Sequence, residues 1–163
     1  MLINRLTVLA VATLSALFAG GGVIALAKSH PPGALPIPRG ADGHFWADGA
    51  ASSDTGRAEI HFLVDTGASS VALTAADAAR LGLKPERLIY SRPVYTAEGE
   101  TYAAPVMLSR LIVAGAELRE VKALVLQDDS GKGGPPRSSL LGMSYLGRLS
   151  RMTATRDSLL LEP

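Results

Sequence analysis

The amino-acid sequence predicts an all-β fold for most of this 163-residue chain. Short apolar runs are separated by glycines and polar clusters, as expected of strands joined by turns. One convincing helix interrupts them, and the length suits one folded domain. Hydrophobic residues make up 47% of the chain and charged residues only 19%, which argues against a disordered tail or a solvated basic protein.

The N-terminal part contains an uncharged run over residues 6–27, LTVLAVATLSALFAGGGVIALA. A helix of ~20 apolar residues can span a bilayer, so we expect a signal anchor over residues 1–28. The alternative is a signal peptide cleaved after Ala27, although such apolar regions usually have only about 7 to 15 residues. Basic residues flank both ends of the run, and the orientation that we expect puts the folded domain outside the cytoplasm. The predicted location is therefore the cytoplasmic (inner) membrane, with a single pass and a periplasmic domain.

Residues 29–43 are rich in proline and glycine and predict an extended linker. The folded domain is then expected over residues 44–163, roughly 120 residues, enough for one modest core. Arg5 is the only charged side chain before Lys28, so the 16 basic and 15 acidic residues leave the remainder neutral, and no nucleic-acid partner is expected. The sequence has no cysteine, which excludes disulfides and thiolate sites, and its three histidines lack the spacing of a metal site.

The first strands are predicted at residues 44–49 and 57–64, joined by a turn over 51–56. A short helix should follow from Thr74 to Leu81. Thr74 suits the N-cap, Asp77 places a carboxylate in the first turn, and Gly82 suits the position after the helix. These features predict a helix of roughly two turns.

The second half of the domain is expected to contain five more strands, over residues 88–95, 101–108, 111–113, 118–126 and 158–161. Residues 96–100 should form a hairpin tip, with a glycine able to adopt positive φ. Residues 128–138 have the composition of a loop, and residues 143–149 that of a short helix. Tyr90 and Tyr95 are expected to be packing residues.

Asp65 is the main candidate for chemistry, because it follows the apolar strand residues Phe62, Leu63 and Val64 directly. A carboxylate in a tight turn at such a strand end can be held by backbone amides and can activate water. The alternative is a structural capping aspartate. The chain has a second Asp-Thr-Gly triplet at residues 54–56, but this follows a polar segment and predicts an exposed turn.

These motifs together resemble the retropepsin-like aspartic proteases, in particular the short, membrane-anchored bacterial members with one lobe per chain. The matching text is LVDTGAS at residues 63–69, AADAARLGL at 75–83 and LLGMSYL at 140–146. The resemblance implies a single-lobe β barrel. It also implies an active-site turn formed by Asp65, Thr66, Gly67, Ala68 and Ser69, above a supporting motif formed by Leu140, Leu141 and Gly142.

The resemblance further implies an aspartic endopeptidase that works as a homodimer on peptide or unfolded-protein substrates without a cofactor. Each subunit would supply one Asp65, and the two carboxylates would share a proton. Glu98 and Gly99 would form the tip of a flap over the substrate, where relatives usually have Ala-Asn-Gly instead of Ala-Glu-Gly. A surface hairpin without contact is the alternative there. The alternative for the whole domain is a non-catalytic peptide-binding or scaffold module on the same fold.

Overall fold

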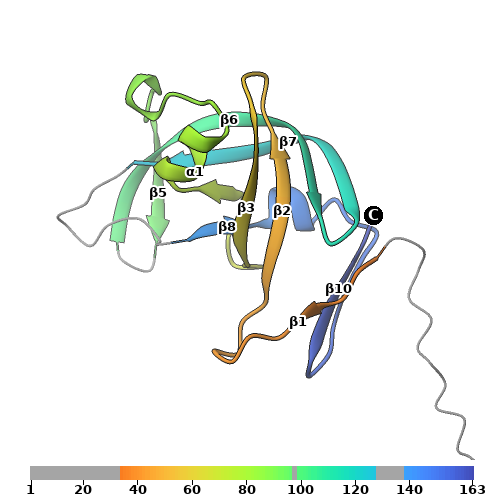
Figure 1. Ribbon diagram of the computed structural model, residues 1–163. Coiled ribbons are helices and arrows are strands. Elements are labelled where there is room, and N and C mark those ends of the chain that lie inside the picture. The colour runs from red at the N-terminus through yellow and green to blue at the C-terminus, as the bar shows by residue number, and fades with distance from the viewer. Residues whose placement is uncertain (1–33, 97–98, 128–137) are drawn as a thin grey trace, which may run out of the picture.

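A computed structural model describes residues 34–96, 99–127 and 138–163 (Figure 1). Within these ranges, two short α-helices, one 3-10 turn and ten strands follow one another. In order they are β1 (Ile37–Pro38), β2 (Trp46–Ser52), β3 (Arg57–Val64), β4 (Val71–Leu73), α1 (Ala75–Arg80), η1 (Pro85–Arg87), β5 (Arg92–Thr96), β6 (Gly99–Val113), β7 (Ala116–Leu126), β8 (Ser139–Leu141), α2 (Met143–Leu146), β9 (Arg151–Ala154) and β10 (Ser158–Glu162).

Six strands close into a barrel in the order β2-β3-β8-β4-β7-β6, because β6 also pairs with β2. The pairs β3–β8 and β4–β7 are parallel, and the other pairs in the barrel are antiparallel. β5 pairs only with the first part of β6, so this hairpin projects beyond the closed barrel (Figure 1). Closure pairs both edges of this six-stranded sheet with each other, so the barrel formed by the described strands has no free strand edge.

The barrel core follows from alternation along the strands. In β3, Ile60 and Phe62 are fully buried, whereas Glu59 and His61 between them face solvent. A second, smaller cluster lies beside the β5–β6 hairpin and contains Ala72, Ala103, Leu124 and Leu126, with Val94 and Leu140 packed against it. This cluster, named here the hairpin cluster, supports the region where the candidate site lies.

The predicted helix is confirmed as α1. The Thr74 hydroxyl accepts a hydrogen bond of 3.1 Å from the Asp77 amide, and Gly82 has φ of +76° after the helix. The predicted strands 101–108 and 111–113 are one continuous strand, β6. The strand predicted over 88–95 is shorter at its start, because β5 begins at Arg92 and residues 88–91 connect it to the 3-10 turn η1. β4, β8 and β9 were not predicted as strands.

The segment expected to be a linker differs in part from the prediction. From Ala34 onward it is packed on the domain, and Ile37 is 4% exposed in the main core. β1 pairs antiparallel with β10, which also pairs with β9, and this small sheet lies beside one end of the barrel (Figure 1). Pro38 is tolerated there because β1 is an edge strand, where a missing N–H costs no ladder bond.

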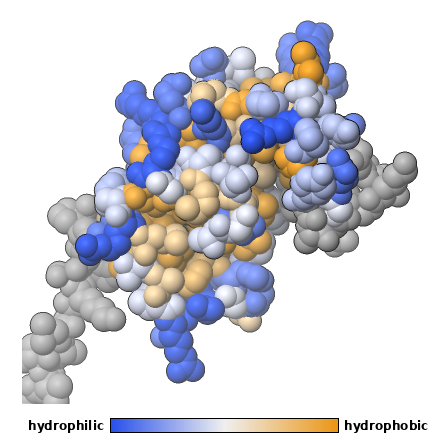
Figure 2. Space-filling view, turned by 180° about the vertical axis from the view of Figure 1, so that it is seen from behind, coloured by the Kyte–Doolittle hydropathy of each residue, from blue (hydrophilic) through white to orange (hydrophobic). Residues whose placement is uncertain are grey.

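The surface carries isolated hydrophobic side chains among hydrophilic ones, as Figure 2 shows for one face. Tyr95 is 83% exposed, so its prediction as a packing residue is wrong, whereas Tyr90 is partly buried and its hydroxyl donates to the Pro85 carbonyl at 3.2 Å. Tyr95 lies on the face of β5 that points away from the hairpin cluster.

The predicted membrane span, residues 6–27, lies outside the described residues, as do Glu98 and the predicted loop apart from its last residue. Within the part of the chain that the structure describes, no helix has both the length and the apolar character needed to cross a bilayer.

Candidate active site

Asp65 lies immediately after β3, in a tight turn that holds its carboxylate. The Gly67 amide donates a hydrogen bond of 2.8 Å to Asp65 Oδ1, and the Ala68 amide donates to the Asp65 carbonyl at 3.3 Å. The Asp65 amide itself donates to the Leu141 carbonyl at 3.1 Å. The carboxylate is therefore oriented by backbone groups while the residue remains partly exposed, which is the arrangement expected of a group that meets substrate.

The segment Leu140 to Gly142 lies directly beneath this turn. Leu140 is paired with both Leu63 and Ala72, so β8 is inserted between β3 and β4. A Cβ atom built on Gly142 would lie 2.2 Å from the Ser70 carbonyl oxygen, closer than any real contact. Glycine is required at this position because the two backbones approach too closely for any side chain.

Two further hydrogen bonds join the segment after Gly142 to the turn and its neighbours. The Met143 amide donates to the Ala68 carbonyl at 2.8 Å. The Ser144 hydroxyl accepts from the Val71 amide at 2.8 Å and donates to the Lys122 carbonyl at 2.7 Å. Ser144 thus joins α2 to β4 and β7. Ser144 lies within the LLGMSYL motif, but its role was not predicted, because Val71 is 73 residues away along the chain.

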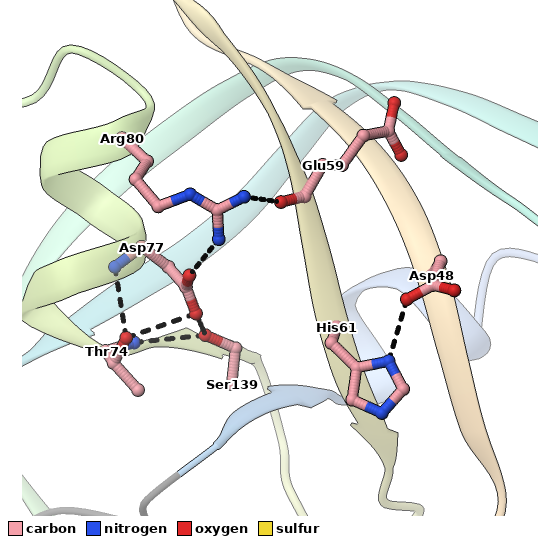
Figure 3. A network of polar contacts seen from close by, with 7 residues as sticks. All are labelled: Asp48, Glu59, His61, Thr74, Asp77, Arg80 and Ser139. Carbon is pink, nitrogen blue, oxygen red and sulfur yellow. Dashed lines mark hydrogen bonds and ion pairs between the residues drawn. The ribbon is translucent and has the colours of Figure 1, made fainter.

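A polar network ties α1 to the start of β8 (Figure 3). Ser139 is 1% exposed; its hydroxyl donates to Asp77 Oδ2 at 2.6 Å and accepts from the Thr74 amide at 3.1 Å. Arg80 donates to Asp77 Oδ1 at 2.9 Å and to the Glu59 carbonyl at 2.5 Å. Ser139 was not predicted as a supporting residue, although a serine directly before two apolar strand residues was a visible signal.

A groove of about 700 Å³ opens beside the Asp65 carboxylate. Its floor is formed by apolar side chains of the hairpin cluster, and its sides by the active-site turn and by β5. The lining residues that matter here are Asp65, Ser69, Arg92, Val94, Leu124 and Leu126. An extended peptide placed in this groove would bring a backbone carbonyl close to Asp65 and apolar side chains onto the floor.

The other predicted site residues that the structure describes lie on the turn that follows Asp65 and at the end of the β5–β6 hairpin. Thr66, Gly67 and Ser69 are exposed on the active-site turn, and Ala68 is partly buried. Gly99 begins β6 opposite Thr96, with φ of +129°, at the end of the hairpin beside the groove.

Asp54 lies in the exposed turn between β2 and β3, at the opposite end of β3 from Asp65 (Figure 1). The Ser53 hydroxyl accepts there from the Thr55 and Gly56 amides at 3.1 Å each. The predicted turn is thus confirmed. The two triplets cannot contribute to one site within a subunit, because the whole of β3 separates them.

In the part of the chain that the structure describes, the other titratable groups do not form a metal-binding cluster. No group of three or more histidine or acidic side chains comes together in the described ranges 34–96, 99–127 and 138–163. His61 pairs with Asp48 at 2.7 Å on the solvent face of β2 and β3 and stacks on Trp46 (Figure 3 shows the pair).

Comparison with known proteins adds a family to this geometry. Residues 54–148 match the family described as "gag-polyprotein putative aspartyl protease". An uncharacterised Rickettsia prowazekii protein is 39% identical over 129 residues, which are 79% of this chain and 51% of that protein. An uncharacterised Sinorhizobium protein is 41% identical over 101 residues, 62% of this chain and 41% of that protein. The chain therefore spans about half the length of these relatives or less.

Among solved structures, the crystal structure of a retropepsin-like aspartic protease from Rickettsia conorii is similar. It is 37% identical in sequence and superposes with a TM-score of 0.64, covering 80% of this chain and 100% of that one. The residues of the family match, 54–148, include the turn that carries Asp65, the hairpin beside the groove and β8 with α2.

Proposed function

Because this chain belongs to the retropepsin-like aspartic protease family, we propose that it is an aspartic endopeptidase whose active site is shared by two subunits. The observation that carries this proposal is the Asp65 carboxylate, which the Gly67 amide orients beside a groove with an apolar floor. Peptide or unfolded-protein segments are the substrates that such a groove suits.

The second subunit follows from the chemistry of the site. Asp65 is the only acidic residue among those that line the groove in the described part of the chain. Peptide hydrolysis by carboxylates needs one group to take a proton from water and another to give a proton to the substrate. A second copy related by a two-fold axis would supply the second carboxylate at the same place.

The proposed reaction uses two carboxylates that share one proton, since two such groups close together cannot both be ionised. The ionised carboxylate accepts a proton from the water as the water oxygen attacks the peptide carbonyl carbon. The protonated carboxylate gives its proton to the carbonyl oxygen. The carboxylate that took the proton from water then gives it to the amide nitrogen, and the C–N bond breaks. The other carboxylate takes a proton back from a hydroxyl of the tetrahedral species, whose carbon becomes that of the product carboxyl group. Thr66 is proposed to brace the pair beneath the carboxylates, while Glu98 and Gly99 contact the substrate from the hairpin.

We also propose that residues 6–27 anchor the protein in the cytoplasmic membrane, with the folded domain outside the cytoplasm. The support is the absence of charge over this run, which is long enough for a spanning helix. The full-length protein should then stay with membranes after carbonate extraction. Release of a soluble form that starts near Lys28 would instead show a cleaved signal peptide.

The experiment that tests the function compares two aspartates in matched sequence contexts. Asp65→Asn should abolish cleavage of an unfolded protein, whereas Asp54→Asn, in the other Asp-Thr-Gly triplet, should leave it unchanged. A peptide with a hydroxyl group that mimics the tetrahedral species should inhibit the wild type. If the wild type binds peptides but cleaves none, the domain is a binding module. Equal loss in both variants would mean that the activity does not depend on the Asp65 turn.

A further inference from the structure

We propose that Arg92 selects substrates with an acidic side chain close to the scissile bond, next to an apolar side chain that occupies the groove floor. This inference rests on the proposed endopeptidase function and names the substrate class for it. Asp65 and Arg92 are the two charged residues among those that line the groove within the described ranges. Because Asp65 is assigned to the reaction, Arg92 is the charged residue of the groove that can bind a charged side chain of the substrate.

The strand register places Arg92 on the face of β5 that carries the hairpin cluster, whose side chains form the floor of the groove. Side chains alternate along a strand, so Arg92 and Val94 share a face, and Val94 packs against the hairpin cluster. Directly opposite residues in an antiparallel pair also share a face, and Arg92 lies opposite Ala103, a buried member of that cluster. Tyr95 lies on the other face of β5, opposite the exposed residue Glu100, and it also lines the groove.

The Arg92 guanidinium is available to a ligand. Among the described residues, no hydrogen bond or ion pair involves this side chain, and the residue is exposed. Arg80 and Arg110, in contrast, each bind a carboxylate within the subunit. A guanidinium offers a planar set of N–H donors that matches a carboxylate, so an acidic side chain fits this position better than an amide.

The neighbours of Arg92 define the rest of the preference. Val94, Leu124 and Leu126 form an apolar surface beside it, of which Leu124 and Leu126 are 7% and 3% exposed. A substrate side chain on this surface gains by removing apolar area from water. In a two-fold symmetric dimer, a second Arg92 would lie on the other side of the scissile bond. The preferred substrate is therefore an extended segment that combines apolar and acidic residues.

The test uses a peptide that the wild type cleaves and scans Glu, Gln and Lys through each position near the scissile bond. At one position or at two symmetry-related positions, kcat/KM for Glu should exceed kcat/KM for Gln by roughly two- to fivefold, the range of an exposed ion pair. Lys should be the poorest of the three. Raising NaCl from about 0.05 to about 0.5 M should reduce this preference, because salt screens exposed charges.

Arg92→Glu should invert the Glu-to-Lys ratio at that same position, and Arg92→Gln should bring it close to one. The matched control is Arg57→Glu, which makes the same charge change on an exposed residue at the end of β3 that lies away from Asp65. It should leave the ratio as in the wild type. If the Arg92→Glu variant cleaves no peptide, the Glu-to-Lys ratio of the Arg92→Gln variant tests the proposal instead. Cleavage with an unchanged ratio at every position overturns the Arg92 proposal only, whereas a wild type that cleaves no peptide overturns the endopeptidase function itself.

Discussion

Gly142 passes beneath Ser70 so closely that a Cβ atom on Gly142 would lie 2.2 Å from the Ser70 carbonyl oxygen. The same atom would lie 2.7 Å from the carbonyl oxygen of Ala68, which accepts a hydrogen bond from the Met143 amide. The turn that carries Asp65 thus rests on the backbone that enters α2. The position of the carboxylate depends on this contact, although the two segments are far apart in the sequence.

Gly142→Ala should therefore displace the active-site turn. We expect a loss of roughly 1 to 3 kcal/mol in the free energy of unfolding, as for overpacking elsewhere, together with loss of proteolysis. Denaturant unfolding and a peptide-cleavage assay measure the two effects. Gly142 has φ of −96°, so the cost comes from the clash and not from its own backbone angle.

The control for this variant is Gly43→Ala. Gly43 has φ of +84° and nothing within 4 Å of a built Cβ atom, so alanine there costs backbone strain without a clash. This variant should lose some stability but keep its activity in the folded state. A Gly142→Ala enzyme with wild-type activity would contradict the account of the turn.

Ser139→Ala should lower stability because it removes both partners that Ser139 provides in the α1–β8 network. The Thr74 amide would lose its acceptor, and leaving such a group unpaired costs about 1 to 3 kcal/mol. Asp77 would lose one donor but keep those from Thr74 and Arg80. Thermal and denaturant unfolding measure this loss. Ser150→Ala, which removes an exposed hydroxyl, should change stability by less than about 0.5 kcal/mol. Similar losses in both variants would show that the network does not stabilise the fold.

The ion pair between Glu117 and Arg110 predicts a pH dependence of stability. The Arg110 guanidinium, 2.5 Å from the Glu117 carboxylate, lowers the pKa of Glu117 below its ordinary value. A lowered pKa in the folded state stabilises the protein above the ordinary pKa, and this contribution is lost as the pH falls through the lowered one.

Glu117→Gln should therefore be less stable than the wild type at neutral pH, and the difference should vanish at acidic pH. Unfolding measured over a series of pH values tests this. Glu86→Gln is the control, because Glu86 is exposed and makes no ion pair among the described residues. A difference between wild type and Glu117→Gln that stays constant with pH would contradict the role of the ion pair.

Local sequence signals predicted α1, the β2–β3 hairpin and the position of Asp65 at the end of a strand. Each of these depends on neighbours in the chain, such as the cap between Thr74 and Asp77 or the alternation along β3. Sequence could therefore place Asp65 in a turn directly after a strand and distinguish this turn from the exposed hairpin turn at Asp54.

Long-range contacts could not be predicted in the same way. β1 has only two residues, too few to show alternation, and its pairing with β10 joins opposite ends of the domain. Ser139 and Ser144 bind groups more than 60 residues away along the chain. The place of Arg92 in the groove depends on the register of β5 against β6, which composition does not fix.

The central claim is that each active site needs Asp65 from two subunits, and mixing subunits tests it most directly. Wild-type protein is held at a fixed amount, and an equal amount of Asp65→Asn protein is added after tagged subunits have shown that the subunits exchange freely. The total number of dimers doubles, and with random pairing about a quarter of them contain two wild-type chains. The number of fully wild-type dimers, and with it the activity, should therefore fall to roughly half of the starting value. Undiminished activity under confirmed exchange would contradict the shared site, because each wild-type subunit would then work without the Asp65 of its partner.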